Sequence, residues 1–158
     1  MTYTDPTLIE MDAFTVTGLS VRTINSNEFN PETAKLPQLW GNFFASGMAE
    51  TIPNRLLESP IFGVYSNYDS DATNYYTLTA GVSINSKGNN PELNTVDIQK
   101  GHYLVFKDKG IMPQVLIKTW ERIWVYFATN SEYKRCFNTD FEVYLNSDEI
   151  AVYIGIIK

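Results

Sequence analysis

Two short stretches of this sequence share four of six letters, and that repeat constrains the fold more than any other feature. The stretch FGVYSN occupies residues 62–67, and FEVYLN occupies residues 141–146, an offset of 79 positions. Apolar residues alternate with other residues in both, which is typical of a β-strand. The copies differ most at their second position, where Gly63 matches Glu142. The repeat therefore predicts two equivalent strands, one with a carboxylate where the other has open space.

The expected elements follow the same order on both sides of a polar linker at 84–94. In each part a strand, a helix and two strands succeed one another, which suggests an internal duplication. Trp40 matches Trp120 within the predicted helices, and we paired Gly18 with Gly101 and Gly81 with Gly155. The predicted elements are strands at 14–24, 61–68, 75–84 and within 95–110, a closing hairpin around 146–148, and helices near 36–48 and 116–127.

This order predicts an α+β fold in a single domain spanning 1–158, with halves at about 12–84 and 95–157. Two β-α-β-β halves related by a pseudo-twofold axis would form a largely antiparallel sheet with both helices on one face, and a cleft for a ligand. We expected Phe141 and Val143 to point at the helices. Glu142 would then point the other way, into the cleft.

Charge and composition exclude several classes of function. The formal net charge is −6, and the longest run of basic residues is Lys134-Arg135, so direct nucleic-acid binding is disfavoured. No window is apolar enough for a membrane span, and the N-terminus lacks the pattern of a signal peptide. Cys136 is the only cysteine, which is typical of a reducing compartment. We therefore expected a cytoplasmic protein with no membrane association.

The chain resembles the GyrI-like family, the effector-binding domain of some AraC-type and MerR-type multidrug regulators. The resemblance rests on the order and spacing of several segments and covers about residues 12–157. The segments that carry it are LPQLWGNFF (36–44), IFGVYSNYDSD (61–71), YTLTAGV (76–82), IQKGHYLVF (98–106), WERIW (120–124), DFEVY (140–144) and VYIGI (152–156).

The resemblance implies a bulky, lipophilic and often cationic ligand, bound in an aromatic cleft without a cofactor. The family's acidic pocket residue maps to Glu142. A carboxylate among aromatic faces suits a cation. The strand pattern alone favours an ordinary glutamate on a solvated face, but the repeat mismatch together with the resemblance favours the pocket. The expected aromatic set is Tyr65, Tyr103, Tyr144, Tyr153, Trp40, Phe44, Trp120 and Trp124.

Two other functions remain open at this point. Some members of the family are similar to hydrolases that open strained cyclopropane rings of genotoxins, and Glu142 would then activate water. Alternatively, the acidic surface would serve as a protein-interaction module, such as an inhibitor, whose partner the sequence does not name. Because the predicted domain fills the chain, we expected a stand-alone binder without its own DNA-binding segment. His102 is the only histidine and Cys136 lacks a reactive setting, so we predict no metal site and no catalytic role for either residue. In the hydrolase alternative, Tyr144 or Tyr65 would assist Glu142 in proton transfer.

Overall fold

The computed structural model describes residues 6–71, 73–86, 93–130 and 132–157 as an α+β fold built on an eight-stranded antiparallel sheet. The strand order is β1-β6-β8-β7-β3-β4-β2-β5. Most of the 84–94 linker, residues 87–92, lies outside the described residues. The strands are β1 (Thr7–Met11), β2 (Phe14–Thr23), β3 (Ile61–Ser66), β4 (Tyr76–Ile84), β5 (Asn94–Ile98), β6 (Gly101–Lys109), β7 (Lys134–Asn146) and β8 (Glu149–Ile157). The helices are α1 (Asn25–Glu28), α2 (Leu36–Ala45), α3 (Met48–Thr51) and α4 (Gln114–Thr129).

The pairing registers of the two halves are related by constant offsets. β3 and β7 pair at the centre, where Gly63 lies opposite Glu142, its own counterpart at the offset of 79. The flanking strands continue the pattern, since β4 pairs with β3 as β8 pairs with β7. At the edges β5 pairs with β2 of the first half, and β1 pairs with β6 of the second. The pairing registers of the central strands are therefore symmetric about the Gly63–Glu142 pair.

The same registers correct two of the sequence pairings. Gly18 faces Gly81 on β4, and the corresponding pair in the second half is Val105 with Tyr153. Gly101 and Gly155 are therefore not the counterparts of these glycines. Gly18 and Gly81 allow β2 and β4 to approach closely, because a Cβ on Gly18 would lie 1.8 Å from the backbone oxygen of Ala80.

Two further predictions about strands were incomplete. The stretch 95–110 forms two strands, β5 and β6, separated by a turn at residues 99–100. The polar lead-in at 1–10 contains most of a strand, since β1 covers Thr7–Met11. Both errors concern edge strands, whose hydrogen bonds to a distant part of the chain leave little local signal.

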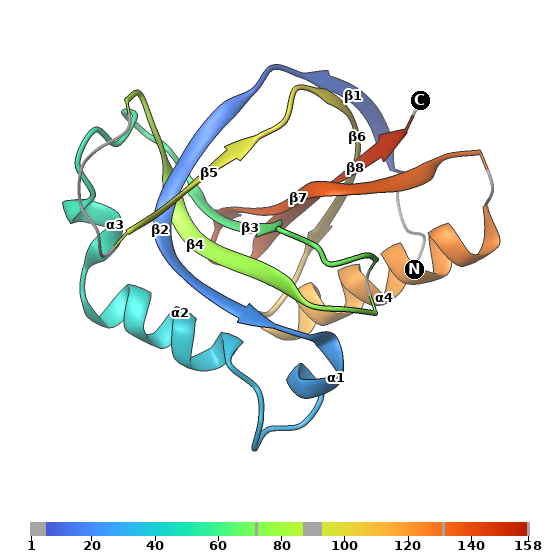
Figure 1. The fold of residues 1–158 in the computed structure, drawn as a ribbon, viewed down its shortest axis with the longest axis horizontal. Coiled ribbons are helices and arrows are strands. Elements are labelled where there is room, and N and C mark those ends of the chain that lie inside the picture. Colours follow the sequence, from blue (N-terminus) through green and yellow to red (C-terminus); the bar gives the residue numbers. More distant parts are fainter. Residues whose placement is uncertain (1–5, 72, 87–92, 131, 158) are drawn as a thin grey trace.

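The two longer helices, α2 and α4, form where the sequence predicts them, whereas α1 and α3 were not predicted. Leu39 and Phe43 of α2 are buried against the β4 face formed by Leu78, Ala80 and Val82. The helix ends before Gly47, whose φ of +64° is accessible to glycine at little cost. α4 packs through Val115 and Ile123 against β6 and β8. Figure 1 shows α2 and α4 along the same side of the curved sheet, with α1 near the space between them.

The opposite face of the sheet is also covered, and this reverses one prediction. Phe141 and Val143 do not point at the helices; they lie in a core with Phe62 and Val64 on the concave face. Glu142, one residue out of phase, points into the helix layer, and Leu145 is half exposed. The prediction assumed that the apolar face of a strand is the helix face. Here the sheet curves so strongly that its outer strands cover its own central strands.

Candidate functional site

Glu142 lies at the centre of the helix-side face, directly beneath the space between α2 and α4. Its side chain is fully buried at 1% exposure. The hydroxyl of Tyr65 and the indole Nε1 of Trp120 each donate to Oε2 at 2.7 Å. The hydroxyl of Tyr144 donates to Oε1, also at 2.7 Å. Three donors from three elements thus converge on one buried carboxylate.

Burial and hydrogen bonding act on Glu142 in opposite directions. Desolvation raises the pKa of the carboxyl, and the bonds from Trp120, Tyr65 and Tyr144 offset only part of that effect. The phenols respond to the same surroundings, because burial first and the neighbouring carboxylate second raise the pKa values of Tyr65 and Tyr144 well above 10. The tyrosines therefore remain donors throughout the range in which Glu142 titrates.

Aromatic rings surround the carboxylate in a pseudo-symmetric pattern. The ring of Trp120 meets that of Tyr65 edge-on at 5.1 Å between centroids. Trp40, the counterpart of Trp120 on α2, meets Tyr144 in the same manner at 5.3 Å. Each helix therefore supplies a tryptophan that packs on a tyrosine of the central strands. Gly63 completes the arrangement, because its missing side chain leaves room for Trp40 and the carboxylate.

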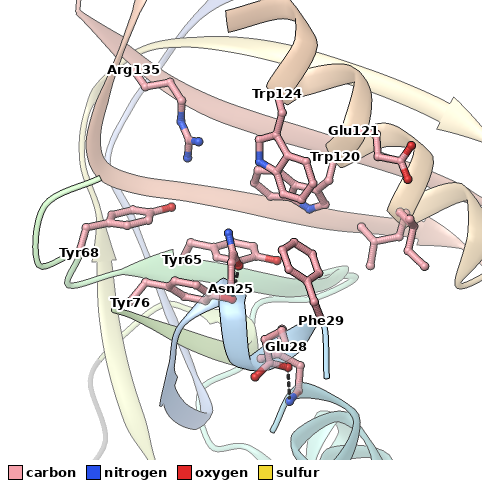
Figure 2. Close-up of a pocket in the computed structure, with 13 residues that line it drawn as sticks. Asn25, Glu28, Phe29, Tyr65, Tyr68, Tyr76, Trp120, Glu121, Trp124 and Arg135 are labelled. Carbon is pink, nitrogen blue, oxygen red and sulfur yellow. Dashed lines mark hydrogen bonds between the residues drawn. The ribbon is translucent and has the colours of Figure 1, made fainter. Parts of the chain in front are cut away.

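A cavity of about 400 Å³ opens beside this cluster on the first-half side. Figure 2 shows Tyr65, Tyr68 and Tyr76 beneath it, with Trp120 and Trp124 of α4 on the far wall. Residues of α1, Phe29 directly after it and Leu36 at the start of α2 close the remaining side. A cavity of this size suits an aromatic small molecule. Its lining consists of Asn25, Glu28, Phe29, Leu36, Tyr65, Tyr68, Tyr76, Leu116, Ile117, Trp120, Glu121, Trp124 and Arg135.

The charges around the cavity are mostly acidic. Glu28 and Glu121 line it, and Glu142 lies behind Tyr65 and Trp120. Glu28 also accepts the backbone N–H groups of Lys35 and Leu36, so it joins α1 to the start of α2. The guanidinium of Arg135 is paired with the buried carboxylate of Asp140 at 2.7 Å, which offsets its charge. The cavity thus carries a negative potential in aromatic surroundings.

The structure separates the predicted site residues into three groups. Tyr65, Trp120 and Trp124 line the cavity. Tyr144, Trp40 and Phe44 gather on the α2 side of Glu142, where Phe44 stacks on Trp40 at 5.9 Å, but they do not line it.

Tyr103 and Tyr153 lie on the other face of the sheet and cannot join the site. Both pack in the concave core, where Tyr153 stacks on Phe141 at 4.5 Å. The register of β7 and β8 pairs Tyr153 with Phe141, which places Tyr153 on the concave side. The structure therefore does not bring Tyr103 and Tyr153, two members of the expected aromatic set, together with Glu142.

Several cavity residues were missed by the sequence reasoning. Asn25, Glu28 and Phe29 fall in the stretch read as a loop, which contains the one-turn helix α1. The sequence does indicate the position of Tyr76, because alternation along β4 places it on the same, helix-side face as Leu78. Arg135 and Tyr68 carried none, since only tertiary packing brings them to the cavity.

The described part of the chain lacks two specific features, a metal-ligand cluster and a membrane-spanning helix. Among those residues, no three His, Cys, Asp or Glu side chains come together as metal ligands would. The helices of the described ranges also include none with the length and apolar character needed to cross a membrane.

Comparison with known proteins identifies relatives over nearly the whole chain. Residues 7–156 match the family Cass2, described as integron-associated effector binding protein. The chain is 27% identical over 159 residues to YobU of Bacillus subtilis (strain 168), named as a transcriptional regulator protein; the match covers 96% of this chain and 97% of YobU.

Two solved structures share the fold. The integron cassette protein VCH_CASS2 of Vibrio cholerae superposes with a TM-score of 0.83 at 33% identity, covering 98% of this chain and 97% of that one. The protein SAV2435, solved bound to tetraphenylphosphonium, superposes with a TM-score of 0.78 at 12% identity, covering 98% and 94%.

Proposed function

Because this chain belongs to the Cass2 family of integron-associated effector-binding proteins, we propose that it binds lipophilic aromatic cations in the cavity beside Glu142. Small-molecule binding follows from the family, and the preference for cations is our inference from the site. The main observation behind the proposal is that Tyr65 and Trp120, which both line the cavity, donate hydrogen bonds to the same buried carboxylate, that of Glu142.

This arrangement favours a cation for two physical reasons. A positive charge over an aromatic face gains about 0.5–2 kcal/mol from the ring quadrupole. A carboxylate that accepts a hydrogen bond from the ring's polar group adds its own attraction, which is strong because the surroundings exclude water. Glu142 therefore acts through Tyr65 and Trp120, and a ligand need not touch it.

The acidic residues at the cavity supply the second line of support. Glu28 and Glu121 add negative potential, while Arg135 is offset by Asp140. The fold neighbour SAV2435 was solved with tetraphenylphosphonium, a bulky lipophilic cation of the proposed class.

Titration of tetraphenylphosphonium into the protein and into Glu142→Gln tests the proposal, with the fluorescence of Trp120 and Trp124 as the signal. The substitution keeps shape and hydrogen-bonding capacity but removes the charge. We expect affinity to fall by about 10- to 100-fold, or 1–3 kcal/mol. Glu132→Gln, which removes the same charge from an exposed position, is the matched control and should bind as the wild type does.

A neutral compound of similar shape, triphenylphosphine oxide, separates charge from shape. Its affinity should change less than threefold in Glu142→Gln. Equal losses for the cation and the neutral compound would mean that the substitution damages the cavity, and no loss for either would refute the role of Glu142.

A further inference from the structure

Arg135 is a cationic residue in a cavity that otherwise suits cations. It enters from β7, and Figure 2 shows its guanidinium directed toward the space beside Tyr68, well away from Glu28 and Glu121. Its side chain is only 7% exposed. The cavity therefore has two chemically different ends, one acidic and one with a guanidinium.

The guanidinium is held firmly from one side. Nη2 donates to Oδ2 of Asp140 at 2.7 Å, and the hydroxyl of Tyr68 donates to the same oxygen at 2.5 Å. The backbone N–H of Gly155 donates to Oδ1 at 2.8 Å. Asp140 is fully buried and has three donors. The guanidinium also lies 4.4 Å from the ring centroid of Phe137, which fixes its plane.

The remaining donors of Arg135 are not used by the described protein. Its buried Nε has no hydrogen-bond partner among the residues that the structure describes. No hydrogen bond joins Nη1 to any of those residues either, and the residue lines the cavity. A guanidinium carries N–H donors on three nitrogens. Nε is too buried to reach the cavity, so an acceptor placed in the cavity would bond to Nη1.

Resting on the proposed function, we propose that the natural ligand carries a neutral carbonyl oxygen at the end away from its cationic group, and that Arg135 donates a hydrogen bond to this oxygen. A neutral acceptor fits better than a carboxylate, because Asp140 already offsets the charge of Arg135 and the other side chains give the cavity a negative potential. The ligand class is thus an aromatic cation with a carbonyl at its far end.

Three matched probes test this inference. The parent is 1-methyl-4-phenylpyridinium, and its 4-acetylphenyl and 4-carboxyphenyl analogues add a neutral or an anionic acceptor at the far end. We expect the acetyl compound to bind at least fivefold more tightly than the parent, and the carboxylate to bind less tightly than the acetyl compound. An acetyl compound no tighter than the parent would overturn the inference. A carboxylate that binds best would assign this end to anions and overturn the neutral acceptor.

Variants connect the preference to Arg135. The double variant Arg135→Met with Asp140→Asn removes the ion pair as a unit, so that no buried charge is left alone. We expect it to lose the advantage of the acetyl compound, measured as the ratio of the dissociation constants of the parent and the acetyl compound in each protein. An advantage that persists would exclude Arg135 as the donor.

A second variant covers the case in which the double variant fails to fold. Arg135→Lys retains a cation for Asp140 but not the planar set of donors, so it should reduce the advantage of the acetyl compound at least threefold. An unchanged advantage would count against the inference.

The experiments distinguish a failure of the proposed function from a failure of the inference about Arg135. If the parent cation does not bind, or binds equally to wild type and Glu142→Gln, the cation site is wrong. If the parent behaves as proposed and only the acetyl advantage is missing, the inference about Arg135 is wrong.

Discussion

Gly63 lies directly opposite Glu142 in the β3–β7 ladder, and a Cβ built on Gly63 would lie 2.9 Å from Oε1 of that carboxylate. The same Cβ would lie 3.0 Å from Cζ2 of Trp40. The two positions are counterparts in the repeat, so one half provides the charge and the other provides the space for it. The central carboxylate therefore depends on an asymmetry between otherwise matching strands.

Gly63→Ala should disturb this arrangement. Both distances are shorter than Cβ contacts usually allow, and the carboxylate is held by three donors, so we expect the free energy of unfolding to fall by about 1–3 kcal/mol. Urea denaturation measures the loss. Gly41→Ala is the matched control: it lies in α2 with nothing within 4 Å of its Cβ position, and should stabilise the protein by about 0.5–1 kcal/mol. A Gly63→Ala protein as stable as the wild type would show that the site accommodates a methyl group without strain.

Cation affinity should depend on pH through Glu142. Burial raises its pKa above the usual 4.5, and only the ionised form attracts a cation strongly, so affinity for tetraphenylphosphonium should rise with pH through this window and then level off. The slope can reach about tenfold per pH unit, because one proton is involved. The probe itself does not titrate. Dissociation constants measured from pH 4 to 8 should show the rise in the wild type and a much flatter profile in Glu142→Gln. Parallel profiles in the two proteins would contradict this assignment.

The stability of the protein should show the opposite pH dependence. Since the pKa of Glu142 is raised by folding, the folded state binds more protons than the unfolded state between pH 4.5 and the raised value. Stability therefore falls as pH rises through that window, with a slope of at most about 1.4 kcal/mol per pH unit. Glu142→Gln lacks this loss, so its stability relative to the wild type should improve from pH 5 to pH 8. Urea titrations at both pH values measure the difference, and a constant difference would contradict the burial of an ionisable group here.

Tyr144→Phe should weaken cation binding without changing the cavity wall. Tyr144 donates to Glu142 but does not line the cavity, and its loss removes a bond that favours the ionised carboxylate. The pKa of Glu142 should rise further, so affinity should fall several-fold within the pH range where Glu142 titrates and recover toward the wild-type value on the high-pH plateau. The unfolding free energy should decrease by about 1–2 kcal/mol. Tyr75→Phe, at a half-exposed position, is the control for loss of a phenol. An affinity deficit independent of pH would mean that Tyr144 acts in some other way.

The sequence by itself determined the α+β class, the positions of the two longer helices, and the pairing of two matching strands at the centre of the sheet. These are local properties: apolar periods of 3.6 and 2 residues, the stop at Gly47, and the repeat that singles out Gly63 and Glu142. The repeat also placed Trp40 and Trp120 on equivalent helices, and both contact the central tyrosines.

Only the tertiary structure decided which face of the sheet holds the site. Alternation along a strand distinguishes two faces but does not say what covers each, and here the curved sheet buries Phe141 and Val143 against its own outer strands. Glu142 consequently faces the helices, while Tyr103 and Tyr153 fall in the other core. Arg135 came to the cavity in the same way, because its place depends on an ion pair with Asp140 and on packing against Phe137, which a linear pattern of residues does not encode.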